Sequence, residues 1–334
     1  MILSNLSALV EGKLSNTPSI TSFEDVSFDA HKVKRGDLFV ALNHNDIETA
    51  VLNGAYGILF DKPTQITDQE IAWIKVESID NALLRLLRFR IMEKSPQVYS
   101  CDSISIKLAS QIITSNKLIV LNKGLREHIQ ELYALEKESV ILFNEKIINP
   151  SLFIDIKPLS KIGNSSINIV EQTLFETSFI YDDTYYERQL LSPFFMPYLE
   201  SVLQFFKQMG IKYQMRDFKA INHFQPVFTN IHFQVKEFGQ SDKVLIFESD
   251  FELIKEQIEF LHAKANWAKI IYLVPSARVE ELDIVENIYA YDSAWDIMQT
   301  LKNEKFHFAL IAEQDAEILN ADVFAPKIEQ PSLF

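Results

Sequence analysis

Glycine is scarce in this chain, and its scarcity limits both the turns and the ligand loops that the chain can form. Eight of the 334 residues are glycine, about a third of the usual share of ~7%. Loops that hold phosphate groups depend on glycine for positive φ and for close approach of the backbone. No two glycines form a Gly-x-Gly, and none precedes Lys-Ser or Lys-Thr. The sequence therefore lacks both the dinucleotide-binding fingerprint and the glycine-lysine phosphate loop.

Short apolar runs alternate with helical periodicity along most of the chain. Residues 38–42 and 57–60 are typical of buried strands, and residues 79–92 carry leucine and isoleucine at helical spacing. The same alternation continues through residues 97–145 and returns from 243 to 311. Alternating strands and helices predict an α/β fold with parallel or mixed sheets.

A different pattern separates these two alternating regions. Residues 167–170, 177–181 and 185–190 favour antiparallel strands around an Asp-Asp turn. Helices are predicted over 197–210, which ends in a glycine, and over 218–223. The pattern of predicted strands and helices changes near residues 95 and 234. We therefore expect three α/β domains, at 1–95, 96–234 and 235–334.

Charge and composition exclude several classes of function. The net charge of −14 repels the phosphates of nucleic acids and anionic lipids, so we expect no nucleic-acid partner. No apolar run reaches the roughly 18–20 residues of a membrane helix, so we expect no membrane insertion. Cys101 is the single cysteine, which is typical of a cytoplasmic protein. The seven histidines show no metal-ligand spacing, so no metal site is expected.

The first region resembles the N-terminal domain of the Mur ligases, in particular the branch that adds D-alanyl-D-alanine to UDP-N-acetylmuramoyl peptides. That family has an Asp-Ser/Thr-Arg triplet, a Pro-Gly-Asp-like turn, a Leu-Phe-Val-Ala-Leu strand and a later Gly-Ala. Here residues 29–31 are Asp-Ala-His, 34–37 are Lys-Arg-Gly-Asp, 38–42 are Leu-Phe-Val-Ala-Leu and 54–57 are Gly-Ala-Tyr-Gly. The Phe-Gln-Pro-Val at 224–227 is similar to a later family segment. The resemblance implies a three-domain α/β architecture with reduced central and C-terminal domains.

The family's ATP loop, Gly-x-x-Gly-Lys-Thr/Ser, has no counterpart at the corresponding place. Residues 99–107 contain no glycine, and Ser103, Ser105 and Lys107 stand where the loop would end. Apolar residues at 194–197 replace the family's His-Asn pair, and the Asn-Pro of the C-terminal domain is missing from 248–251. Because loop, lysine and magnesium supply nearly all the catalysis of phosphoryl transfer, we expect no catalytic residues and no cofactor.

The resemblance also places the candidate ligand residues, which would contact a UDP-sugar-type ligand. They follow two predicted strands or lie in the second of them: Asp29, His31, Phe39, Asn43, His44, Asn45 and Asp46. An alternative interpretation of residues 43–46 is a polar turn that caps a short helix, with Asp46 as the cap. Since His31 replaces the arginine of the family triplet, it offers one donor in place of a planar fork, and we expect weak diphosphate binding.

Three functions remain open at this stage. The first is a non-catalytic Mur-ligase-like protein that binds a UDP-muramoyl peptide or a cell-wall synthesis protein in the cytoplasm. The second is a divergent ATP-dependent amide ligase, which would need ATP and magnesium. The third is a structural protein-interaction module that binds no small molecule.

Overall fold

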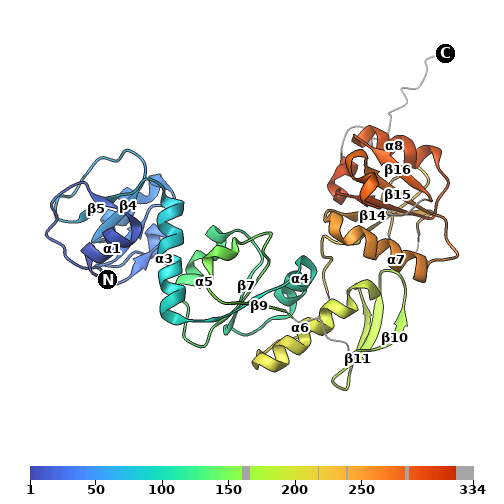
Figure 1. The fold of residues 1–334 in the computed structure, drawn as a ribbon, viewed down its shortest axis with the longest axis horizontal. Coiled ribbons are helices and arrows are strands. Elements are labelled where there is room, and N and C mark those ends of the chain that lie inside the picture. The colour runs from blue at the N-terminus through green and yellow to red at the C-terminus, as the bar shows by residue number, and fades with distance from the viewer. Residues whose placement is uncertain (160–165, 217, 238–239, 283–285, 321–334) are drawn as a thin grey trace, which may run out of the picture. The chain divides into compact units, whose positions relative to one another are not determined.

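The computed structural model describes residues 1–159, 166–216, 218–237, 240–282 and 286–320. The chain divides into two compact units: unit 1 is Met1–Ile106 with Thr114–Leu159, and unit 2 is Lys107–Ile113 with Ser160–Phe334. Figure 1 follows the chain by colour from one end to the other. The three predicted domains are a finer division, and their boundaries at 95 and 234 stay predictions.

The first sheet of unit 1 has the strand order β1-β5-β4-β3-β2, in which β2 to β5 are parallel and β1 is antiparallel to β5. Its strands are β1 (Lys13–Leu14), β2 (Val26–Ser27), β3 (Leu38–Val40), β4 (Gly57–Phe60) and β5 (Ala72–Lys75). The elements around it are α1 (Leu3–Val10), η1 (Ala30–Lys32), η2 (His44–Asp46), α2 (Ile47–Leu52) and α3 (Ile79–Lys94).

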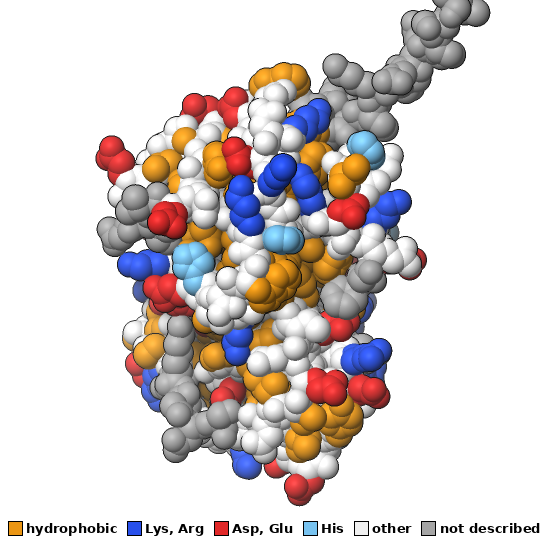
Figure 2. Space-filling model, turned by 90° about the vertical axis from the view of Figure 1, so that its right-hand side faces the viewer, with side chains coloured by type: hydrophobic (Ala, Val, Ile, Leu, Met, Phe, Trp, Pro, Cys, Tyr) orange, Lys and Arg blue, Asp and Glu red, His pale blue; other side chains and the backbone are white. Residues whose placement is uncertain are grey.

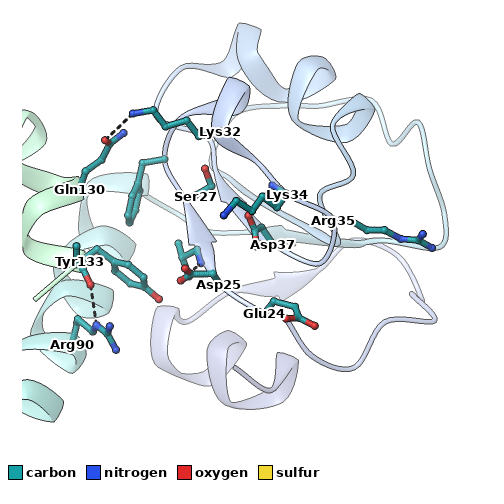
Figure 3. A pocket seen from close by; sticks show the side chains of 13 residues that line it. Glu24, Asp25, Ser27, Lys32, Lys34, Arg35, Asp37, Arg90, Gln130 and Tyr133 are labelled. Carbon is teal, nitrogen blue, oxygen red and sulfur yellow. Dashed lines mark hydrogen bonds between the residues drawn. The ribbon is translucent and has the colours of Figure 1, made fainter. Parts of the chain in front are cut away.

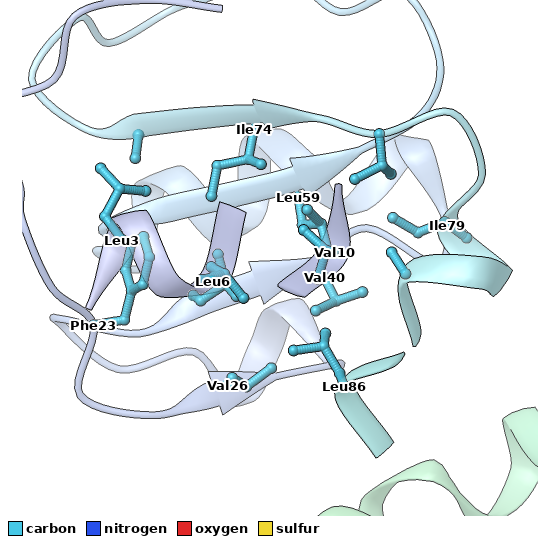
Figure 4. Close-up of a cluster of buried hydrophobic side chains, with 14 residues drawn as sticks. Leu3, Leu6, Val10, Phe23, Val26, Val40, Leu59, Ile74, Ile79 and Leu86 are labelled. Atoms are coloured by element: carbon cyan, nitrogen blue, oxygen red, sulfur yellow. The ribbon is translucent and has the colours of Figure 1, made fainter. Parts of the chain in front are cut away.

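Alternating strand residues divide the core of this sheet between its two faces. Val40 and Leu59 pack with Leu6 of α1 on one face (Figure 4), whereas Phe39 and Trp73 belong to a separate cluster on the other. This division follows from the two-residue period of a strand.

The second sheet of unit 1 is parallel throughout, with the order β7-β8-β6-β9. Its strands are β6 (Gln97–Ser100), β7 (Leu118–Leu121), β8 (Val140–Phe143) and β9 (Ile156–Pro158); η3 (Leu125–His128), α5 (Ile129–Tyr133) and η4 (Pro150–Leu152) accompany them. Helix α3 serves both sheets, because Ala82 and Leu86 join the core of the first and Leu83 and Leu87 join the core of the second. Figure 1 shows α3 between them.

The predicted antiparallel strands lie in unit 2 and pair in the order β10-β11-β12. Its second sheet has the order β13-β14-β17-β15-β16, parallel except for β13. The strands are β10 (Asn168–Gln172), β11 (Thr177–Tyr181), β12 (Thr184–Gln189), β13 (Gln225–Thr229), β14 (Lys243–Glu248), β15 (Ile270–Pro275), β16 (Ile288–Tyr291) and β17 (Phe308–Ala312). The helices are η5 (Pro193–Phe195), α6 (Met196–Met209), η6 (Phe251–Leu253), α7 (Ile254–Lys264), η7 (Ser276–Glu281), α8 (Ala294–Asn303) and η8 (Ala316–Asn320).

One local prediction for unit 2 is wrong. Residues 218–223 form no helix, because His223 turns inward to a buried carboxylate of β14. Asp250 caps η6, the short helix that leads into α7, because its carboxylate accepts from the Glu252 N–H. The glycine end of α6 is confirmed, since Gly210 closes it at φ 62°.

Helix α4 (Ser103–Ile112) belongs to both units. Its first residues continue from β6 in unit 1, whereas Lys107–Ile113 is part of unit 2.

Candidate functional site

The predicted ligand residues of unit 1 lie after two neighbouring strands. Asp29 follows β2 and Asn43 follows β3, and the carboxyl ends of these parallel strands meet at one edge of the sheet, which is where open α/β sheets bind ligands. The Asp29 carboxylate accepts a hydrogen bond from the His31 N–H at 3.0 Å, and the His31 side chain is exposed. Asn53, which follows the last residue of α2, donates to the Ala30 carbonyl at 2.9 Å and fixes this turn against the end of the helix.

Residues 43–46 form a polar turn that caps itself. The Asn43 side chain accepts from the Asn45 N–H at 3.2 Å and donates to the Asp46 carboxylate at 3.4 Å. His44 Nδ1 lies 3.5 Å from Thr64 Oγ1. The structure therefore shows the capping turn, although the capping side chain is Asn43 and not Asp46, which makes no cap hydrogen bond to α2. Ligand contacts by residues 43–46 stay a prediction.

Phe39 lies in β3, within the predicted strand, but its side chain is buried. Its side chain is 1% exposed and packs in the cluster with Ile58 and Trp73. The ring has no surface left for a ligand, because its position in β3 points it into the core.

A groove of about 580 Å³ runs beside β2, the edge strand of the first sheet. Figure 3 shows Lys32 and Lys34 on one side, facing Gln130 and Tyr133 of α5 and Arg90 of α3. Lys32 donates to Gln130 Oε1 at 3.3 Å. The sequence offered one signal for this groove, the basic run at 32–35, but its other wall comes from residues far along the chain.

The groove carries charges of both signs, because three acidic residues line it beside four basic ones: Glu24, Asp25 and Asp37 with Lys32, Lys34, Arg35 and Arg90. The Arg90 guanidinium donates to the Tyr133 carbonyl at 2.9 Å and to the Glu93 carboxylate at 2.7 Å, and it lies 5.3 Å from the centre of the Tyr133 ring. Burial raises the pKa of Tyr133 to about 12, so its hydroxyl stays a donor at neutral pH. Lys34 is exposed. These donors suit an anionic or phosphorylated ligand.

The predicted ATP-loop position is a short join between β6 and α4. Cys101 and Asp102 alone separate the strand from the helix. The Asp102 carboxylate accepts from the Ser105 N–H at 2.7 Å and from the Ser105 hydroxyl at 2.8 Å. Asn144 donates to the Cys101 carbonyl at 2.8 Å. The Ser105 N–H at this helix start therefore already donates to a carboxylate of the chain itself.

The three side chains at this position differ in burial. Ser105 is 1% exposed, whereas Ser103 and Lys107 are half-buried. Desolvation lowers the pKa of Lys107, and the charge of Glu248 opposes this effect. At Cys101, burial and then the neighbouring Asp102 charge raise the pKa of the thiol, so it is a poor nucleophile at neutral pH.

Unit 2 contains a buried polar cluster that sequence reasoning missed. Glu248 is 0% exposed and accepts four hydrogen bonds: from His223 Nδ1 at 2.7 Å, the Phe224 N–H at 3.0 Å, the Asp250 N–H at 2.8 Å and Gln257 Nε2 at 2.5 Å. Phe224 adopts φ 43°, a rare angle for an aromatic residue. The pairing depends on residues 25 positions apart, so no local motif reveals it.

Within the described residues, no three His, Cys, Asp or Glu side chains come together to hold a metal ion. No helix in the described part of the chain has the length and apolar character needed to cross a membrane.

Comparison with known proteins identifies the fold. No protein-family model matches the sequence, and no curated protein does. The structure of MurF from Acinetobacter baumannii is similar over 97% of this chain and 98% of its own, at 10% identity and a TM-score of 0.50. MurF ligase from Thermotoga maritima in complex with ADP is 15% identical over 88% of this chain and 95% of its own, with a TM-score of 0.40. The predicted Mur-ligase-like α/β architecture is confirmed as a likeness of fold to the first of these.

Proposed function

We propose that this chain, which has a fold similar to that of MurF ligases, is a non-catalytic binding protein linked to peptidoglycan precursor synthesis in the cytoplasm. The observation that carries the proposal is the join between β6 and α4. There the Asp102 carboxylate accepts a hydrogen bond from the Ser105 N–H, a group that a phosphate-binding loop would offer to its ligand.

The charge at this join opposes nucleotide binding. Phosphate loops present several free backbone N–H groups and a lysine to the β- and γ-phosphates. Here two residues connect strand and helix, and a carboxylate at the helix start repels a phosphate while it already satisfies the N–H. Since ATP positioning supplies most of the catalysis in this chemistry, its loss supports a binding role over a ligase.

The proposed ligand is a UDP-muramoyl peptide held by unit 1. Such a molecule carries a diphosphate and peptide carboxylates as well as amide and hydroxyl donors. The groove beside β2 offers the cations Lys32, Lys34 and Arg90 to the former and the carboxylates Glu24, Asp25 and Asp37 to the latter. Asp29 and His31 lie in the turn next to Lys32, so these two predicted residues adjoin the groove, although they are not among its lining residues.

Titration calorimetry with a UDP-muramoyl tripeptide and with Mg-ATP tests this proposal. We expect saturable binding of the muramoyl peptide and none of Mg-ATP. Lys34→Gln should weaken binding of the muramoyl peptide about fivefold, since a charge-assisted contact contributes about 1 kcal/mol. Lys13→Gln is the matched control, because Lys13 is an exposed lysine on β1 at the opposite edge of the same sheet.

Two results would replace the proposal. Phosphate release from ATP that depends on a muramoyl substrate and an amino acid would establish the divergent amide ligase. Absence of binding and of any thermal shift with muramoyl peptides, together with recovery of cell-wall synthesis proteins in a pull-down, would favour the interaction module.

A further inference from the structure

Unit 2 has a concave site of its own, and four aromatic rings line it. The site has a volume of about 520 Å³. Phe175 lies between β10 and β11, Phe228 in β13, Phe308 in β17 and Trp267 after α7. Four separate segments thus bring aromatic side chains to one place.

The rings form a connected wall that is only partly buried. Phe175 lies 5.6 Å from Phe228 and 6.3 Å from Phe308, and Trp267 lies 6.0 Å from Phe308, measured between ring centres. The Trp267 side chain is 69% exposed. Figure 2 shows a face of the molecule on which hydrophobic side chains gather among His and charged side chains of both signs. Exposed aromatic area around a cavity is typical of a ligand site.

The turn that carries Phe175 is fixed before any ligand arrives. Thr173 Oγ1 accepts from the Phe175 N–H at 3.2 Å and from the Glu176 N–H at 2.9 Å. The Thr173 N–H donates to the Glu176 carbonyl at 2.9 Å. A preformed wall lowers the entropic cost of binding.

The charge of the site is opposite in sign to that of the chain. Lys264, the last residue of α7, lines it, and no Asp or Glu is among the described residues of its lining. The Lys264 side chain remains in contact with water, because it is exposed. In a chain of net charge −14, this local balance favours an anion at the rim beside an apolar body against the rings.

We propose that this pocket binds a small, flat molecule that has an apolar body and one negatively charged group. The rings of Phe175, Phe228 and Trp267 contact the apolar body, and the Lys264 ammonium pairs with the charge. This site is independent of the muramoyl-peptide proposal, because every lining residue belongs to unit 2.

Fluorescence titration with 8-anilino-1-naphthalenesulfonate tests the aromatic wall. We expect one saturable site in the full-length protein. Trp267→Ala should weaken binding of this probe at least about fivefold, because stacking on an aromatic side chain contributes about 1–3 kcal/mol. Trp295→Ala is the control, since Trp295 is 55% exposed on α8 outside the pocket. Equal affinities of the two variants would overturn the proposal.

The neutral analogue N-phenyl-1-naphthylamine tests the charge. Lys264→Gln should weaken binding of the sulfonate about fivefold and leave the affinity for the neutral compound unchanged. Lys302→Gln on α8 should change neither affinity. Equal losses for both compounds at Lys264, or no loss for the sulfonate, would contradict a charge-pairing lysine. Unchanged thermal melting of all four variants confirms that each is folded.

Discussion

Gly36 adopts φ +102°, in the turn before the core strand β3. A Cβ at this position would lie 2.7 Å from Glu24 Cγ. The turn is needed because the Gly36 carbonyl accepts from Glu24 and its N–H donates to Gly54. This one glycine therefore serves the backbone of the first sheet and not a phosphate.

Gly36→Ala should lower the free energy of unfolding of unit 1 by about 1–2 kcal/mol, the usual cost of a left-handed non-glycine residue. Urea titration followed by fluorescence of the buried Trp73 measures the change. Gly124→Ala is the control, because Gly124 has φ −61° and suits alanine. An equal effect at both positions would show that the Gly36 turn is not strained by a side chain.

Glu248→Gln should destabilise unit 2 by about 3 kcal/mol. The amide keeps the shape of the side chain but turns one acceptor into a donor, which then faces two of the four N–H groups now bound. Urea unfolding gives the magnitude, with Glu259→Gln as an exposed control on α7. A loss below about 1 kcal/mol would mean that the cluster is not fully paired.

At the scale of elements, Asp102 is the residue that defines the start of α4. Asp102→Ala should destabilise the protein by about 1–2 kcal/mol through loss of the cap, and calorimetry should still detect no Mg-ATP binding. Asp80→Ala removes another acidic side chain near a helix start, but its pair with Arg126 is exposed, so about 0.5 kcal/mol or less is expected. Nucleotide binding by Asp102→Ala would indicate a phosphate site blocked only by this carboxylate.

The sequence was a good guide to elements with strong local patterns. The helix predicted over 79–92 is α3, because its leucine spacing leaves few alternatives. Residues 218–223 were predicted as a helix and are not one. Their conformation depends on the hydrogen bond between His223 and Glu248, which local periodicity does not predict because the two residues are far apart in the sequence. Strand β16 was missed for a similar reason: only its pairing with β15 identifies it.

The candidate site was predictable only in part. Asp29 and Asn43 lie at the expected edge of the sheet, because they directly follow apolar strands. The burial of Phe39 was not predicted, because a family motif does not say which strand residues face inward. The groove wall at Arg90 and Tyr133 depends on how two sheets share α3, which a linear pattern does not show.

At the scale of the whole molecule, the second half of α4 packs in unit 2, although it lies in the sequence between two segments of unit 1. Gln111 exchanges two hydrogen bonds with the Lys219 backbone, at 3.0 and 2.8 Å, and the Ile112 carbonyl accepts from the Gln214 N–H at 2.7 Å. Leu108 is 0% exposed. Residues 107–113 are therefore an integral part of the second folded unit.

Leu108→Ala should raise hydrogen exchange in unit 2 and leave β1 to β5 unchanged, because a buried leucine contributes about 2–5 kcal/mol to the unit that it packs in. Leu6→Ala in α1, also 0% exposed, should produce the reverse pattern. Mass spectrometry of the full-length variants resolves the two. Uniform exchange changes in both variants would mean that the chain unfolds as one cooperative body.

The shared helix has a consequence for how such a protein can evolve. The chain passes from one unit to the other three times, at 106/107, 113/114 and 159/160. A recombination event with a single crossover would leave one unit without part of its fold. Neither unit can be inherited, duplicated or fused to another gene as one contiguous segment, so we expect the two to remain together in descendants of this chain.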